Sequence, residues 1–191
     1  MDQILLGQVK KLQSKDADER YAAYKYVINL TNEPVDWAYQ VWDDMLQLLH
    51  NGDNHQRSIA AQMLSSLAKS DPEERMLKDL HHLIAATKDE MFVTARHSLQ
   101  SLWMVAVASD ELKKKVVDQL SKRFNECTKE KNSTLVRYDI LEVFRKIYNE
   151  KPDEKLKNKC VSLIDTEEDP KYKKKYAGLW KDLMKVTKAK K

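Results

Sequence analysis

Glycine and proline are scarce in this chain, with three glycines and four prolines among 191 residues. Sheet proteins use both residue types in hairpins and bulges, so the shortage favours helices joined by short polar turns. The chain is instead rich in Lys, Leu, Ala, Glu and Gln, which lose little rotamer freedom in a helix. The sequence therefore predicts an all-α protein.

Signals for helix ends divide the chain into short segments. Each of the four prolines is expected where a helix begins, because its missing N–H costs little in the first turn. Capping boxes are predicted at Ser70–Glu73 and Thr87–Glu90, and Gly52 is predicted to end one helix just before Asp53 caps the next. With apolar residues at helical spacing, these signals predict ten helices. The predicted helices run near 2–14, 16–31, 34–49, 53–69, 72–87, 89–108, 110–128, 132–149, 152–164 and 169–187.

A repeated pattern links these helices. Asp16 and Arg20 align with Asp53 and Arg57 at a shift of 37 residues, and the apolar residues that follow align as well. Larger shifts extend the alignment to Arg137, Asp169 and Lys173. Copies about 35 to 45 residues apart have the period of two-helix repeats, which stack because one helix pair cannot bury its apolar stripe alone. The predicted repeats cover about 1–31, 34–69, 72–108, 110–149 and 152–187, with a basic tail at 188–191.

This pattern resembles the HEAT repeat of the HEAT/armadillo class, in which an Asp, followed a turn later by Arg or Lys, opens the second helix of each pair. The resemblance implies an all-α, right-handed α-solenoid of about five antiparallel helix pairs, forming a single repeat domain over 1–191. It also implies a structural ladder of these side chains between neighbouring repeats. An Asp four residues before an Arg makes an i,i+4 pair, and the Asp caps the helix as well. The matching ladder residues are Asp16, Arg20, Asp53, Arg57, Arg137, Asp169 and Lys173.

The second helices of such repeats line one concave surface, where a partner is expected to bind. Aligning the repeats places one polar residue of each in a row, namely Lys25, Gln62, His97 and Glu142. Aromatic and Arg side chains are common interface anchors. The candidates are Tyr24, Trp37, Tyr39 and Arg145, each expected to be exposed. The sequence thus predicts a non-catalytic protein-interaction scaffold that binds a partner peptide or helix on this face.

Positive charge gathers toward the C-terminal end. Residues 151–191 carry a net charge of +6, against −2 for the remainder. The basic patch fits either a solvated capping helix or an electrostatic handle for nucleic acid or an acidic partner. It consists of Lys171, Lys173, Lys174 and Lys175. Nucleic-acid binding is the alternative function. Its enzymatic version would resemble the HEAT-like alkylpurine DNA glycosylases, but no tryptophan here is followed four residues later by the Asp of that family.

Catalytic and metal-binding patterns do not occur in the sequence. The three glycines are too scattered for a phosphate loop, and no GxSxG, HExxH or zinc-spaced set is present. Adjacent helical residues point about 100° apart, so His81 and His82 are not expected to share a metal. Cys127 and Cys160 are predicted to be small buried residues in a reduced compartment. We therefore predict no catalytic residue, no metal, no cofactor and no small-molecule substrate.

The N-terminal residues lack the basic and apolar regions of a secretion signal. No stretch reaches the roughly 18 apolar residues that a membrane span needs. We expect a cytoplasmic protein without a membrane partner, and the polar, capped ends favour a complete chain.

Overall fold

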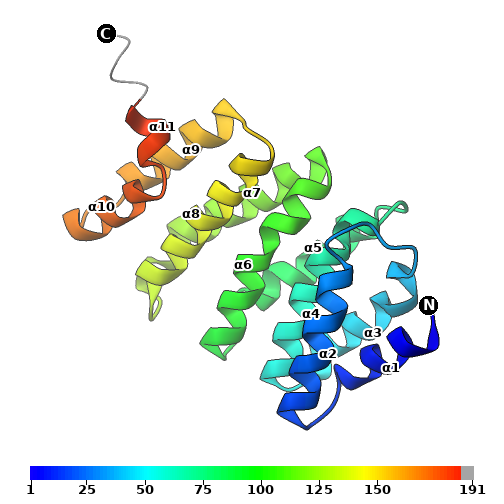
Figure 1. Cartoon of the computed structure of the whole chain (residues 1–191). Coiled ribbons are helices and arrows are strands. Elements are labelled where there is room, and N and C mark those ends of the chain that lie inside the picture. Colours follow the sequence, from blue (N-terminus) through cyan, green and yellow to red (C-terminus); the bar gives the residue numbers. More distant parts are fainter. Residues whose placement is uncertain (186–191) are drawn as a thin grey trace. The chain divides into compact units, whose positions relative to one another are not determined.

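All regular structure among residues 1–185, the part that the computed structural model describes, is helical (Figure 1). This confirms the predicted all-α class. The helices are α1 (Gln3–Lys11), α2 (Ala17–Leu30), α3 (Ala38–Asn51), α4 (Asn54–Leu67), α5 (Arg75–Ala86), α6 (Phe92–Ala108), α7 (Asp110–Glu126), α8 (Ser133–Glu150), α9 (Glu154–Asp165), α10 (Pro170–Gly178) and α11 (Lys181–Lys185), with short 3-10 turns at Ala68–Ser70 and Cys127–Lys129. None of these helices is long and apolar enough to cross a membrane.

The chain forms two compact units, Met1–Lys113 and Lys114–Lys191, with the boundary inside α7. Each unit is described by itself. The single repeat domain over 1–191 stays a prediction.

Helix α4 is the centre of the first unit. It packs against α2, α3, α5 and α6, and nine of its fourteen residues are buried. Figure 1 shows α2, α4 and α6 lying side by side. Small residues such as Ala60, Ala61 and Ser65 let the neighbouring helices approach α4 closely. Larger side chains, including Met63 and Leu64, fill the remaining space of the core.

The second unit has an aromatic core around α8. Phe124 and Tyr176 are fully buried with their rings 6.3 Å apart, and the Tyr176 hydroxyl donates to the Thr134 carbonyl at 2.9 Å. Cys127 and Cys160 are buried free thiols in this unit, as predicted for small core residues. Burial raises the pKa of both thiols, so both are held as unreactive thiols.

The tenth helix was predicted to be continuous over 169–187, and this prediction is wrong for the described part of that range. Helix α10 ends at Gly178 and α11 begins at Lys181. Between them, the Leu179 and Trp180 amides donate to carbonyls only three residues back, which tightens the chain into a turn. The indole of Trp180 is thereby fully buried beside Tyr148, with ring centroids 5.6 Å apart. Burial of one large aromatic side chain outweighs the local preference for a continuous helix.

The predicted roles of the prolines hold only in part. Pro170 lies in the first turn of α10, where its missing N–H leaves no broken bond. Pro34, Pro72 and Pro152 lie two to four residues before the helix that follows each of them. The residue before a proline is biased toward extended backbone, so these three prolines shape the connections rather than open helices.

Two predicted capping boxes are also wrong, although a different side chain caps one of the two helices. Asp71, and not Ser70, caps α5 by accepting from the Arg75 and Met76 amides at 2.9 and 2.7 Å. Helix α6 has no side-chain cap at all. A carboxylate has two acceptor oxygens, one for each of these amides, whereas a hydroxyl has one oxygen. This difference favours Asp at this position. The predicted stop at Gly52 and cap at Asp53 are confirmed, with a complete capping box closed by Gln56.

Candidate partner-binding groove

The first turns of α2, α4 and α6 surround a groove of about 560 Å³ in the first unit. Its walls come from Tyr21 and Tyr24 on α2, from Ile59 on α4 and from Val93 on α6. The groove has its position because the three helices pack in the order α2, α4, α6. The hydroxyl of Thr94 reinforces this packing by donating to the Asn54 carbonyl at 2.9 Å.

A chain of hydrogen bonds fixes the floor of this groove. The Tyr24 hydroxyl donates to Gln62 Oε1 at 2.8 Å, and Gln62 Nε2 donates to the Ser58 carbonyl at 3.0 Å. The Ser58 hydroxyl and His97 Nδ1 are 2.8 Å apart. Burial lowers the pKa of His97, with a smaller effect from the charge of Arg96. The neutral form of His97 is therefore favoured near pH 7, and the imidazole tautomer decides whether the Ser58 hydroxyl or Nδ1–H is the donor in this bond.

The rim of the groove is apolar and exposed. Tyr21, Met91 and Val93 are 58%, 47% and 64% exposed. Exposed apolar side chains gathered at one concave site are a common feature of interaction surfaces. The ammonium of Lys25 lies 4.7 Å from the centre of the Tyr21 ring, so this ring already receives a cation.

Asp18 is the charged residue that the groove presents to solvent. It lines the groove, is exposed, and has no hydrogen-bond or ion-pair partner among residues 1–185. Arg20 also lines the groove, but it is buried and its Nη1 donates to the Ser14 carbonyl at 2.7 Å. The available charge at this site is therefore negative.

The structure brings part of the predicted row together. Gln62 and His97 both line the groove, and Lys25 reaches its rim through Tyr21. Glu142 and Arg145 belong to the second unit, on α8. The Arg145 guanidinium is bound there to both Asp182 oxygens, at 2.9 and 2.8 Å, and lies 5.6 Å from the Trp180 ring.

The exposure predicted for all four anchors is wrong, since Trp37 is buried and Tyr24, Tyr39 and Arg145 are half-buried. Trp37 is buried, because it lies at the start of α3 against the core. Tyr39 is half-buried, and its hydroxyl donates to Asp71 at 2.5 Å while it accepts from the Glu73 amide at 2.7 Å. Tyr39 therefore holds the connection before α5 in place. Tyr24 is half-buried at the groove.

The predicted i,i+4 pairing is wrong for Arg57. Asp53 caps α4 by accepting from the Gln56 amide at 2.9 Å. Arg57 instead binds Asp89, with Nε and Nη2 donating at 2.7 and 2.9 Å, and reaches the Gly52 carbonyl at 3.0 Å. The carboxylate of a capping Asp faces the helix start, so the arginine one turn later extends to the connection between α5 and α6.

The remaining predicted ladder residues make different contacts. Asp16 and Asp169 cap α2 and α10, respectively. Arg137 donates to Glu167 at 2.7 Å and to the Phe124 carbonyl at 3.1 Å. These bonds join α8 to the ends of α7 and α9, so Arg137, like Arg57, connects its helix to segments distant in the sequence.

The predicted basic patch is largely engaged within its own unit. Lys173 pairs with Asp165 at 3.1 Å, and the ammonium of Lys175 lies 4.6 Å from the Tyr138 ring. Lys171 lies 5.6 Å from the Tyr172 ring. Lys174 is exposed. The predicted tail at 188–191 lies outside the described residues.

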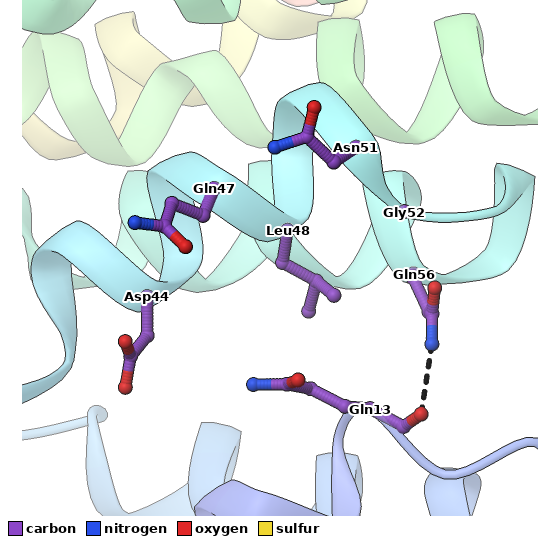
Figure 2. A pocket seen from close by; sticks show the side chains of 7 residues that line it. All are labelled: Gln13, Asp44, Gln47, Leu48, Asn51, Gly52 and Gln56. Atoms are coloured by element: carbon purple, nitrogen blue, oxygen red, sulfur yellow. Dashed lines mark hydrogen bonds between the residues drawn. The ribbon is translucent and has the colours of Figure 1, made fainter.

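A smaller cavity of about 260 Å³ lies beside Gly52 and is lined mainly by amide side chains (Figure 2). The Gln56 amide is already committed, with Nε2 donating to the Gln13 carbonyl at 2.8 Å and Oε1 accepting from the Asp53 amide at 2.9 Å. This bonding joins the α1–α2 connection to α4. The cavity is therefore a packing feature of the fold.

Three histidine rings cluster between α3 and α5. His82 lies 4.5 Å from His50 and 3.7 Å from His81 between ring centres, closer than adjacent helical positions led us to expect. Burial lowers the pKa of His82, and the neighbouring His81 and His50 add to this effect. Among the described residues, no three His, Cys, Asp or Glu side chains are placed so that they could hold a metal ion.

No model of a known protein family matches this chain, and no curated protein sequence matches it.

Sequence reasoning missed Asp18, Tyr21, Met91 and Val93. All four lie at or near helix starts, outside the apolar spacing that predicts the core. The sequence contains only a weak signal for these four residues. An apolar residue in the first turn of a second helix, off the buried stripe, has no packing role and is a candidate for contact with a partner.

Proposed function

We propose that this protein is a non-catalytic interaction scaffold that binds a peptide segment of a partner protein in the groove of α2, α4 and α6. One observation carries the proposal. The exposed side chains of Tyr21, Met91 and Val93 surround a floor whose polar groups are already hydrogen-bonded. A preformed floor costs little ordering on binding, and the apolar rim supplies the affinity.

We further propose that the scaffold is a HEAT-like stack of helix pairs. Hydrogen bonds between helices of the first unit recur at sequence separations close to the predicted period. Tyr24 bonds to Gln62 over 38 residues and Trp42 to Asp79 over 37. Further bonds of this kind join Thr31 to Ser66, Ser65 to Ser101 and Ser58 to His97, over 35, 36 and 39 residues. A right-handed solenoid of about five antiparallel pairs accounts for this regularity.

The Ser58–His97 contact also supports a binding role rather than catalysis. A serine nucleophile needs an exposed hydroxyl and a base that a third group orients. The Ser58 side chain is buried, and its hydroxyl also accepts from Gln62 Nε2 at 3.3 Å. No carboxylate bonds to His97 among the described residues. This pair therefore fits the role of fixing α4 against α6.

The test of this function is peptide selection followed by measurement of affinity. A displayed library of random peptides is panned on the full chain, and the enriched peptides are labelled and titrated by fluorescence anisotropy. Tyr21→Glu and Val93→Glu place a charge on the apolar rim and are expected to weaken binding by about tenfold or more. Both positions are exposed, so the fold is retained, as circular dichroism and thermal melting can show.

Tyr26→Glu is the matched control. Tyr26 is an exposed aromatic residue on the same helix α2, but it does not line the groove. Affinity is expected to be unchanged in this variant. A library that yields no enriched peptide, or peptides that bind Tyr21→Glu as tightly as the unchanged chain, would overturn the proposed function.

A second candidate function is nucleic-acid binding by the second unit. Residues 114–185 carry nineteen Lys and Arg against thirteen Asp and Glu, a net charge of +6. Such binding weakens steeply between about 50 and about 200 mM salt. Anisotropy of a labelled DNA duplex and single strand tests it, with Lys174→Glu expected to weaken binding. Lack of binding at low salt removes this candidate.

A further inference from the structure

We infer that the groove of α2, α4 and α6 takes an extended peptide in which an aliphatic or aromatic side chain is flanked by arginine or lysine. This inference rests on the proposed function and adds the chemistry of the partner. It follows from four features of the first unit: a carboxylate beside an aromatic ring, the net charge, the size of the groove, and the start of α6.

The carboxylate and the ring form a site for a cation. Asp18 and Tyr21 are three residues apart on α2, so they lie on the same face of the helix. Asp18 has no partner among the described residues, and the Tyr21 ring already has the Lys25 ammonium 4.7 Å from its centre. An arginine of the partner can stack on the ring and bond to the carboxylate in one geometry. Lys25 is exposed, so it can move aside.

The charge of the first unit favours the same partner. Residues 1–113 contain twelve Lys and Arg against seventeen Asp and Glu, a net charge of −5. The arginine that lines the groove, Arg20, is buried and bonded to the Ser14 carbonyl. A basic segment is therefore attracted to this unit over long range and meets an available carboxylate at the site, whereas an acidic segment is repelled.

The groove favours an extended segment over a helix. A helix with its side chains is about 10 to 12 Å across, whereas a cavity of about 560 Å³ has the size of a site for a few side chains. Helix α6 begins at Phe92 beside the groove, and its N-cap residue, Met91, makes no side-chain cap hydrogen bond to the amides of the first turn. An extended chain offers carbonyl groups to such amides, while a helix uses its own carbonyls internally.

The probe is a set of synthetic fluorescein-labelled peptides of about eight residues, sized to a groove of this volume. Each has a central Leu-Phe pair, flanked on both sides by Arg, by Ser or by Glu. Each peptide is titrated against the full chain by anisotropy. The Arg-flanked peptide is expected to bind at least about tenfold more tightly than the Glu-flanked peptide, with the Ser-flanked peptide between them.

Three substitutions at the cation site sharpen the test. Asp18→Lys is expected to reverse the order of the Arg-flanked and Glu-flanked peptides, and Asp18→Asn to remove the preference. Lys25→Ala removes the competing cation and is expected to strengthen binding of the Arg-flanked peptide. Both positions are exposed, and a melting curve for each variant shows whether it is folded.

The outcomes separate this inference from the proposed function. In one outcome, Glu-flanked or Ser-flanked peptides bind as tightly as the Arg-flanked one, and Tyr21→Glu abolishes this binding. That result would overturn the inference and leave the groove as the binding site. Lack of any Tyr21-dependent binding across the three peptides, together with failure of the library selection, would overturn both. An order that Asp18→Lys does not change would also overturn the inference.

Discussion

At the scale of single residues, Arg57 shows what a local pattern can and cannot predict. The spacing of Asp53 and Arg57 predicted a ladder residue, and the structure places Arg57 where it joins the Gly52 carbonyl to Asp89. The partner was predicted wrongly because it lies 32 residues further along the chain. A sequence motif reports the helix on which a side chain lies, but not the loop that packs against it.

Arg57→Ala is expected to lower the free energy of unfolding by about 2 kcal/mol, because it leaves the Asp89 carboxylate, only 8% exposed, without its charged partner. Urea denaturation measures this change. The control is Asp43→Ala, which removes the ion pair with Arg75 at a carboxylate that is 72% exposed. The control is expected to cost less than about 1 kcal/mol. Equal losses in the two variants would contradict the structural role of Arg57.

The histidine cluster predicts a dependence of stability on pH. The pKa of His82 is lower in the folded protein than in the unfolded chain, so the unfolded chain binds its proton first. Stability is therefore lost as the pH falls below the unfolded value of about 6.5 and on through the lower folded value. His81 on α5 and His50 on α3 oppose the charged form, while Asp79 favours it. His97 is shifted in the same direction and adds to the loss.

Thermal melting between about pH 7.5 and about pH 5.5 measures this effect, since the carboxylates titrate below that range. The melting temperature is expected to fall with pH, and His82→Gln is expected to flatten the curve. His55→Gln replaces an exposed histidine and serves as the control. A curve that His55→Gln flattens as much as His82→Gln does would contradict the role of the cluster.

At the scale of helices, the ends were harder to predict than the helices themselves. Gly52 was predicted to end α3, and it does, but its φ of −72° is not left-handed. The reason for glycine at this position is space. A Cβ there would lie 2.5 Å from the Leu48 carbonyl oxygen and 2.7 Å from Gln56 Cβ. The break after Gly178 escaped prediction because burial of Trp180, a tertiary effect, decides it.

Two alanine substitutions test this view of the glycines. Gly7→Ala lies inside α1 with no atom within 4 Å of the new Cβ, so it is expected to stabilise the protein by about 0.5 to 1 kcal/mol. Gly52→Ala is expected to destabilise it, because the Leu48 carbonyl is backbone and must shift. Chemical denaturation of both variants gives the comparison. Stabilisation by Gly52→Ala would show that the close contact does not constrain the chain.

At the scale of the molecule, the helical class could be predicted because it is encoded locally. The repeat arrangement stays a proposal, and hydrogen bonds of the first unit over 35 to 39 residues, such as Thr31–Ser66, have separations close to its proposed period. The groove could be predicted only in part. Gln62 and His97 follow from the repeat register, whereas Tyr21 and Val93 depend on how three helix starts come together. The net charges of −5 and +6 on the described parts of the two units were hidden by the overall value.

The central claim is that a partner peptide binds across the starts of α2, α4 and α6. Hydrogen–deuterium exchange of the full chain, with and without a saturating peptide from the library selection, tests it most directly. The structure predicts slower exchange at 17–24, 54–62 and 91–97, with other segments unchanged. The claim would be contradicted if exchange in the groove were unaltered and protection were confined to the segments around Glu142 and Arg145 or to Lys171–Lys175.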